Sequence, residues 1–256
     1  MLTAMRYINL VRRVANWPDY FLAKFGARSS DRIGFRLRSG DLIEVPSSCV
    51  GEFKQIFFGN LYARGLARPV AGGDIIDIGA NVGCFTVFAA SELRPNRIIA
   101  FEPDPHNFRQ LEKNAALNPN RQIIARQQAV GRASGEVTFY NDTSADFTIG
   151  GTLVGDRGAQ RGYAAFRVQC TTLPSILETY RIERCSLLKL DCEGAEFDIL
   201  QSTDDSLLRR IDQIVMEVHE MPGRSMHDIV LRLKSAGFES RSEGPILWAW
   251  QEKPGC

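Results

Sequence analysis

The sequence lacks the features that mark membrane and polyanion-binding proteins. No apolar run approaches the ~20 residues that a membrane-spanning helix needs, and residues 1–13 carry scattered charge without the small-residue cleavage site of a signal peptide. The 31 basic and 30 acidic residues leave a formal net charge of +1, which gives no argument for a nucleic acid or an anionic membrane as a partner. We expect no membrane span and no nucleic-acid partner.

The cysteines also lack a recognisable pattern. None of the six forms a C-x-x-C pair, none has the histidine spacing of a zinc site, and several lie in apolar runs where free cysteine behaves as a small hydrophobe. This usage predicts a reduced, cytoplasmic protein. The composition, 44% apolar and 24% charged, is that of an ordinary globular chain, so 256 residues allow one large α/β domain or two small ones.

The chain is organised around residues 74–86, which read DIIDIGANVGCFT. A short apolar run with an acid near its end is typical of a buried parallel strand, and helical spacing resumes at Cys84. Gly79 and Gly83 separate the two elements and permit a tight turn and the close approach of a ligand. A strand that feeds a helix in this way is expected to present free backbone N–H groups to a nucleotide-type ligand.

The residues missing from this loop indicate which nucleotide it binds. It has neither the third glycine of a dinucleotide fingerprint nor the Lys-Ser/Thr end of a P-loop. Asp77 would repel a pyrophosphate but attract an ammonium group, and Glu102, after the next strand, can accept both hydroxyls of a ribose. These features predict S-adenosylmethionine. The alternative is an ordinary strand–turn–helix unit with Asn81 as the helix N-cap.

Strands and helices alternate from residue 74 onward. Strands are expected at 74–78, 97–101, 122–130, 186–191 and 211–218, and two more at 238–241 and 246–250. This order predicts an α/β fold with a parallel sheet and right-handed crossovers, which binds ligands at the carboxyl ends of its strands. Before it, helices within residues 3–25 broken at Pro18, a hairpin at 33–45 and a helix at 52–62 form an expected extension. We place domain boundaries at 1–65 and 66–256.

Three segments together resemble the FkbM family of S-adenosylmethionine-dependent methyltransferases: DIGANVG at 77–83, FEPDP at 101–105 followed by Leu111 and Asn114, and LKLDCEGAE at 188–196. The match covers about residues 53–220. It implies a Rossmann-like class I methyltransferase fold, with a mostly parallel seven-stranded sheet, helices on both faces and a C-terminal antiparallel hairpin. The adenine is then expected after the third strand, where this chain has amides rather than an acid. The expected cofactor-binding residues are Asp77, Gly79, Ala80, Asn81, Gly83, Glu102, Pro103, Gln128, Ala129 and Asp191.

Two other segments could take part. Tyr62 lies just before the cofactor strand, where an aromatic side chain could reach over the cofactor or simply fill the core. Residues 141–163 are rich in glycine and polar residues, which indicates a surface loop. Such a loop is either a substrate lid or exposed chain without a role.

The chemistry is expected at the end of the fourth strand. A hydroxyl nucleophile usually needs a base or a metal ion, and Asp191 and Glu193 can both face the cleft. Asp191 either holds the methionine end of the cofactor or accepts the proton; His219, after the fifth strand, is a second candidate base. Alternatively, Asp191 and Glu193 bind Mg²⁺ with Glu217 or His219. We favour the metal-independent route, with His219, Asp191 and Glu193 as catalytic residues and no metal ligand. Glu196 is expected only to stabilise a helix N-terminus.

The predicted function is O-methylation of a hydroxyl on a small molecule, a secondary metabolite or a sugar. An NAD-dependent oxidoreductase is the alternative enzyme, although the missing third glycine argues against it. A non-catalytic cofactor-binding module is the other alternative, and the acidic cluster argues against that one. A homodimer is carried as a candidate assembly.

Overall fold

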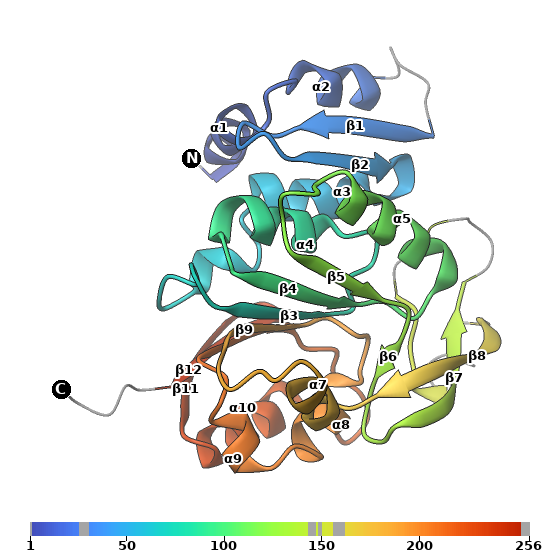
Figure 1. Cartoon of the computed structure of the whole chain (residues 1–256), viewed down its shortest axis with the longest axis vertical. Helices are drawn as coiled ribbons and strands as arrows, with labels where there is room; N and C mark the ends of the chain where they lie inside the picture. The colour runs from blue at the N-terminus through green and yellow to red at the C-terminus, as the bar shows by residue number, and fades with distance from the viewer. Residues whose placement is uncertain (1, 26–30, 143–146, 148–149, 156–161, 252–256) are drawn as a thin grey trace.

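The computed structural model describes residues 2–25, 31–142, 147, 150–155 and 162–251. Its centre is a seven-stranded sheet with the order β11-β12-β10-β9-β3-β4-β5. Figure 1 shows α4 and α5 on one face of this sheet and α8, α9 and α10 on the other. The predicted α/β fold with helices on both faces is therefore confirmed.

Five strands of this sheet are parallel, and the last two form the predicted antiparallel hairpin at its edge. Alternate residues point to opposite faces, so Ile75 and Leu187 belong to one apolar core and Ile76 and Leu188 to another. Burial on both faces explains the almost unbroken apolar runs in the sequence. The strands are β3 (Asp74–Ile78), β4 (Arg97–Phe101), β5 (Ile123–Arg126), β9 (Cys185–Leu190), β10 (Gln213–Glu217), β11 (Phe238–Glu243) and β12 (Ile246–Gln251).

The helices begin where capping residues allow them to begin. Asp104 accepts hydrogen bonds from the backbone N–H groups of His106 and Asn107, and Pro105 occupies the first turn of α5. Ser225 and Asp228 form a capping box at α10. The helices are α4 (Cys84–Phe88, continued by a π-helical segment Ala89–Leu93), α5 (Pro105–Ala116), α7 (Leu173–Thr179), α8 (Glu196–Gln201), α9 (Asp205–Leu208) and α10 (Met226–Ser235).

One predicted strand is wrong in extent. The run at 122–130 is divided: β5 ends at Arg126, and Ala129 and Val130 form β6 in a separate sheet, where they pair with β8. Arg126 and Gln127 are exposed, so this stretch has no apolar side chain to bury against the large sheet. The second sheet has the order β6-β8-β7 and consists of β6 (Ala129–Val130), β7 (Gly135–Asn141) and β8 (Ala164–Thr171).

The N-terminal extension packs above α4 and α5 (Figure 1). The predicted break at Pro18 is confirmed, because α2 begins there. The helix expected at 52–62 begins earlier and ends by Phe58. Apolar side chains of this extension share one core with the large sheet, and the boundary near residue 65 stays a prediction. Its elements are α1 (Leu2–Arg13), α2 (Pro18–Lys24), β1 (Arg32–Arg36), β2 (Leu42–Pro46), α3 (Val50–Phe53) and a π-helical segment Lys54–Phe58.

Asn114 of α5 and Asn118, just beyond the end of that helix, bind the extension to the helical layer of the large sheet. Asn114 accepts from the Glu44 backbone N–H and Asn118 from that of Leu42, each at 2.8 Å. Both side chains also donate to β2 carbonyls, so they continue the hydrogen-bonding pattern of this edge strand. None of the helices in the described part of the chain is long and apolar enough to cross a membrane.

Candidate active site

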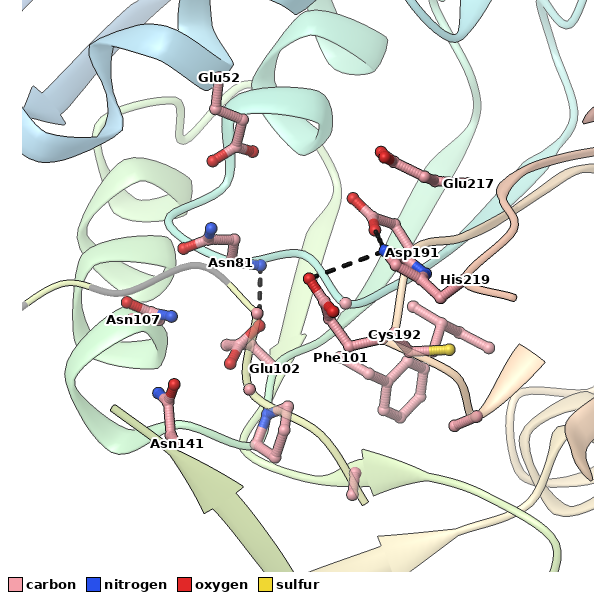
Figure 2. A pocket seen from close by; sticks show the side chains of 18 of the residues that line it. Glu52, Asn81, Phe101, Glu102, Asn107, Asn141, Asp191, Cys192, Glu217 and His219 are labelled. Atoms are coloured by element: carbon pink, nitrogen blue, oxygen red, sulfur yellow. Dashed lines mark hydrogen bonds and ion pairs between the residues drawn. The ribbon is translucent and has the colours of Figure 1, made fainter. Parts of the chain in front are cut away.

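A cavity of about 330 Å³ opens at the carboxyl ends of the parallel strands, within the ~300–1,000 Å³ typical of small-molecule sites. It is lined by the loops after β3, β4, β9 and β10, by α3, and by parts of the second sheet (Figure 2). The position is the one at which open α/β sheets bind ligands. Nine predicted site residues line it: Gly79, Asn81, Glu102, Pro103, Gln128, Ala129, Asp191, Glu193 and His219.

The loop after β3 needs glycine because other backbone lies against it. Gly79 has a φ of +74°, and a Cβ at this position would lie 1.8 Å from the carbonyl oxygen of Asp191. The N–H groups of Gly79 and Ala80 both donate to the Phe101 carbonyl at 3.0 Å, and the N–H of Asn81 donates to Glu102. Three N–H groups of this loop, which were expected to be free for a ligand, therefore already have acceptors at the end of β4 and just after it. Asn81 is not the N-cap of α4 either; Gly83 is.

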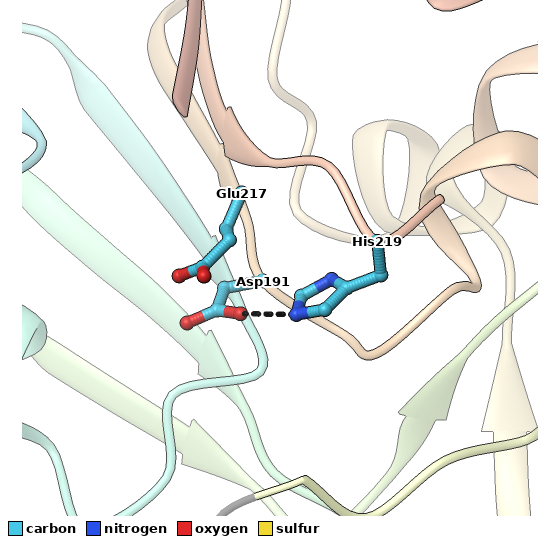
Figure 3. A group of neighbouring side chains, drawn as sticks. All are labelled: Asp191, Glu217 and His219. Atoms are coloured by element: carbon cyan, nitrogen blue, oxygen red, sulfur yellow. Dashed lines mark ion pairs between the residues drawn. The ribbon is translucent and has the colours of Figure 1, made fainter. Parts of the chain in front are cut away.

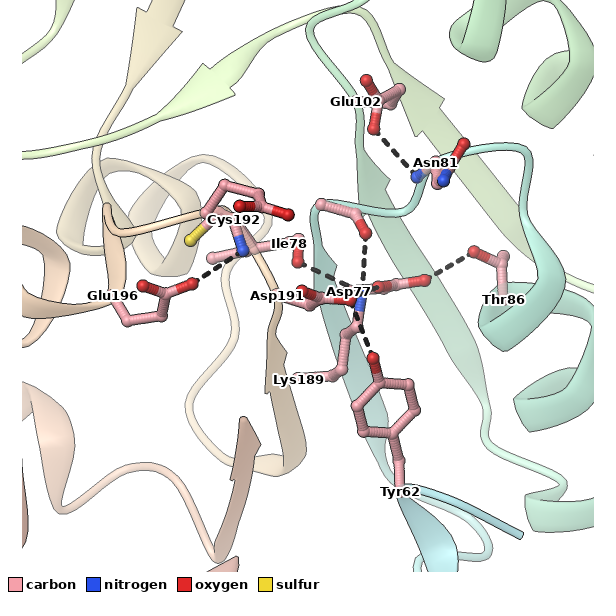
Figure 4. A network of polar contacts seen from close by, with 12 residues as sticks. Tyr62, Asp77, Ile78, Asn81, Thr86, Glu102, Lys189, Asp191, Cys192 and Glu196 are labelled. Atoms are coloured by element: carbon pink, nitrogen blue, oxygen red, sulfur yellow. Dashed lines mark hydrogen bonds and ion pairs between the residues drawn. The ribbon is translucent and has the colours of Figure 1, made fainter. Parts of the chain in front are cut away.

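Asp77 lies behind the cavity wall. Its side chain is fully buried, accepts a hydrogen bond from Thr86 Oγ1 at 2.6 Å, and lies 3.2 Å from the Lys189 ammonium (Figure 4). Of the described residues, Asp77, Ala80 and Gly83 are the predicted cofactor contacts that do not line the cavity. Lys189 already compensates the charge of Asp77, and the predicted direct contact between Asp77 and an ammonium group of the cofactor stays a prediction.

Lys189 links Asp77 to Asp191 behind the cavity wall, and it was not among the residues predicted from the sequence. Its ammonium donates to the Gly79 carbonyl at 2.6 Å and lies 3.9 Å from Asp191 Oδ2. Burial lowers the pKa of Lys189, but Asp77 and Asp191 outweigh burial, so the pKa is raised and the side chain is charged. A lysine inside a strand that is otherwise apolar was the signal that could have identified it.

Glu102 lines the cavity just after β4, and its contact with a ribose stays a prediction. It is almost fully buried, and its two oxygens accept the N–H groups of Asn81 at 2.8 Å and Asp104 at 2.9 Å. Burial outweighs these hydrogen bonds and raises the pKa of Glu102 to about 7. Each carboxylate oxygen can accept a further hydrogen bond, so two adjacent hydroxyls could bind here.

Acidic residues at the carboxyl ends of β9 and β10, the fourth and fifth parallel strands, lie close together in the same cavity. Tyr62 donates its hydroxyl to Asp191 Oδ2 at 2.7 Å, so this tyrosine orients the predicted catalytic carboxylate. Nε2 of His219 lies 3.9 Å from Asp191 Oδ1 and 3.7 Å from Glu193 Oε1. Figure 3 shows the carboxylates of Asp191 and Glu217 side by side, with the imidazole of His219 directed toward them.

Glu196 determines the charge of His219. The carboxylate of Glu196 is fully buried, accepts the N–H groups of Cys192 and Gly194, and lies 3.0 Å from His219 Nδ1. Burial lowers the pKa of His219, but the hydrogen bond to Glu196 and the neighbouring carboxylates raise it to about 9. The role of His219 as a base stays a prediction, and Glu196 does more than stabilise a helix end.

Asp191, Glu217 and His219 together have the geometry of a cation site. One ligand atom each from Asp191, Glu217 and His219 lies within 4.8 Å of the others. Because Glu196 holds Nδ1, the ring presents Nε2 to the two carboxylates, an arrangement often found around metal-binding histidines. Oxygen ligands with one imidazole suit a hard divalent cation. Glu193, the ligand expected from sequence, is not part of this set.

The expected lid lies partly outside the described residues. Gly150, Gly151 and Leu153 line the cavity, and Thr152 donates to the carbonyl of Glu193 at 2.7 Å. Positions 143–146, 148–149 and 156–161 are not described. Closure over a substrate stays a prediction.

The chain is similar to proteins of a recognised family. Residues 77–240 match the model of the methyltransferase FkbM domain, which is more than half of the chain. Methyltransferase 1 from Beauveria bassiana is 31% identical over 192 residues, covering 68% of this chain and 75% of that protein. The 31-O-demethyl-FK506 methyltransferase FkbM from Streptomyces tacrolimicus is 28% identical over 226 residues, covering 78% and 85%.

Two further matches are more limited. The AMB antimetabolite synthetase AmbE from Pseudomonas aeruginosa is 28% identical over 199 residues, and the chain spans only 9% of its length. The crystal structure of methyltransferase FkbM from Methylobacillus flagellatus superimposes with a TM-score of 0.51 at 12% identity, covering 92% of this chain and 59% of that one. The second likeness shows the fold alone.

Proposed function

The chain belongs to the FkbM methyltransferase family, and we propose on that premise that it transfers a methyl group from S-adenosylmethionine to a hydroxyl oxygen. The acceptor is proposed to be a small molecule, a secondary metabolite or a sugar. A relative named as a 31-O-demethyl-FK506 methyltransferase supports oxygen as the acceptor atom. The observation that carries the proposal is the single cavity that both Glu102 and Asp191 line.

The cavity favours this cofactor over a dinucleotide. A pyrophosphate needs free backbone N–H groups at the loop, but those of Gly79, Ala80 and Asn81 already have acceptors. Glu102 instead offers carboxylate oxygens to two ribose hydroxyls. The carboxylates that line the cavity also suit a ligand that has a cationic amino-acid end and an uncharged nucleoside, because neither part carries the negative charge of a pyrophosphate.

S-adenosylmethionine supplies the electrophilic methyl group, so the protein must orient the acceptor and take its proton. We assign the proton to Asp191, whose other oxygen is held by Tyr62. His219 is protonated at neutral pH by its pairing with Glu196 and so serves there as a cation that stabilises the nearby carboxylates. Burial and the neighbouring Asp191 raise the pKa of Glu217, which makes it a second proton acceptor beside Asp191.

A metal-assisted form of the same reaction is the second candidate, favoured by the arrangement of Asp191, Glu217 and His219. A divalent cation at these residues would displace the proton from His219 and acidify the acceptor hydroxyl. We keep the metal-independent form as the proposal.

Calorimetry with S-adenosylmethionine, S-adenosylhomocysteine and NAD, each titrated separately into the intact chain, tests the cofactor. We expect binding of the first two and none of NAD. Binding of NAD alone would revive the oxidoreductase, and binding of the first two without methyl transfer to any hydroxyl acceptor would favour the non-catalytic module.

A further inference from the structure

A further acid lines the cavity from the N-terminal extension, outside the three sequence motifs. Glu52 lies on α3, and Figure 2 shows its carboxylate extending from that helix toward the side chain of Asn81. Its Oε2 atom is shielded from solvent and has no hydrogen-bond partner among the described residues. A buried carboxylate oxygen without a donor is uncommon in folded proteins, so this one is expected to meet a donor supplied by a ligand.

Asn81 presents a second acceptor of the same kind. Its Oδ1 atom is also shielded and unpartnered within the described structure, while its backbone N–H is used by Glu102. The residue has a φ of 50°, a left-handed conformation that non-glycine residues adopt only where the surrounding structure holds them. Two unsatisfied acceptors therefore line one cavity, and both lack a proton donor.

The charges around Glu52 indicate what kind of donor is missing. Among the charged neighbours of Glu52, the cation Lys189 acts on it most strongly, and the carboxylates of Asp191, Asp77 and Glu102 oppose it. Lys189 already binds Asp77 and the Gly79 carbonyl. Burial, with the three other carboxylates, raises the pKa of Glu52 to about 8. The site is short of positive charge, so a cationic donor would bind favourably there.

We propose that Glu52 and Asn81 bind the α-ammonium group of the methionine end of S-adenosylmethionine, the role that the sequence had suggested for Asp77. An ammonium group has three donors and one positive charge, which matches two unpartnered acceptors in a negatively charged corner. This inference rests on the proposed function, because it names the subsite that holds one end of the proposed cofactor. It also gives the N-terminal extension a direct part in cofactor binding.

The test compares two ligands that differ at the amino-acid end. S-adenosylhomocysteine carries the ammonium group, whereas 5′-methylthioadenosine keeps the nucleoside and lacks it. Calorimetry on the full chain should show that Glu52→Gln lowers the affinity for S-adenosylhomocysteine about 10- to 100-fold. This loss corresponds to one charge-assisted hydrogen bond. The affinity for 5′-methylthioadenosine should not change. Glu112→Gln, on the exposed side of α5, is the matched control and should change neither affinity.

Two further measurements keep the inference testable if Glu52→Gln does not fold. Asn81→Gly preserves the backbone N–H group and suits the positive φ at this position. It should lower only the affinity for S-adenosylhomocysteine, by about 2- to 10-fold. In the wild type near pH 7.5, binding of S-adenosylhomocysteine should release part of a proton from Glu52, seen as a binding enthalpy that changes with the buffer. 5′-Methylthioadenosine should release less, because it shares only the ribose contact with Glu102.

Three outcomes would overturn the inference. Unchanged affinity of Glu52→Gln for S-adenosylhomocysteine would place the ammonium group elsewhere. An equal loss for both ligands would assign Glu52 to the nucleoside or to the architecture of the cavity. A wild-type chain that binds neither S-adenosylmethionine nor S-adenosylhomocysteine would remove the proposed function itself, a result distinct from the other two.

Discussion

The charge state of His219 is the prediction on which the choice of base depends. Glu196 lies 3.0 Å from Nδ1 and raises the pKa of His219 from 6.5 to about 9, against the effect of burial. That difference corresponds to about 3 kcal/mol of interaction between the charged imidazole and its surroundings. Replacing Glu196 by Gln should lower the pKa of His219 markedly, because burial remains while the main compensating charge is lost.

The effect on stability has a definite sign. A histidine with a raised folded-state pKa stabilises the fold fully below its unfolded pKa, and this contribution disappears as the pH rises through the folded-state pKa. For His219 the window runs from about 6.5 to about 9. Glu196→Gln should therefore lower the free energy of unfolding by up to about 3 kcal/mol more at pH 6 than at pH 10. The altered hydrogen bonds to Cys192 and Gly194 lower the free energy of unfolding equally at both pH values, so their effect cancels when the losses at pH 6 and pH 10 are compared.

Proton NMR of the imidazole signals in the presence of EDTA measures the pKa directly. The chain has three histidines, so His219→Ala identifies the signal of interest. Glu193→Gln is a useful control, because Glu193 lies farther from the ring, at 3.7 Å, and should lower the pKa less. A wild-type His219 that titrates near 6.5 would refute the reasoning and restore this residue as a neutral base.

Three other predictions follow from the same contacts. Glu102→Ala should weaken S-adenosylmethionine binding by roughly 1.5–3 kcal/mol, or about 10- to 100-fold; an intact variant with wild-type affinity in calorimetry would show that the ribose lies elsewhere. Methylation should survive EDTA; activity that is abolished and then restored by Mg²⁺ would make Asp191, Glu217 and His219 metal ligands. Lys189→Met should lower the free energy of unfolding in urea at pH 7 by about 3–5 kcal/mol, because Asp77 is left buried without its cation. A loss below about 1 kcal/mol would contradict that account, and Asp77→Asn in the same chain should recover part of the loss.

Sequence alone determined the architecture and the location of the site. Short apolar runs alternate with segments in which apolar residues recur at helical spacing, and this order predicts a parallel sheet. Such patterns can be read from the sequence because they depend on which side chains of one element are buried. The carboxyl ends of parallel strands meet at one edge of the sheet, so Glu102, Asp191 and His219 could be placed in one cleft without coordinates. The glycines at 79 and 83 were also readable, since a turn with positive φ admits few other residues.

Only the tertiary structure decided what each charged group does there. Asp77 and Lys189 are far apart in sequence, and their pairing across β3 and β9 removes Asp77 from the cavity. Glu196 changes the charge of His219 through one contact between the start of α8 and the loop after β10. Glu52 reaches the cavity from an extension outside the recognised motifs. Charge state and ligand access depend on burial and on through-space distances of a few ångströms, which local periodicity does not encode.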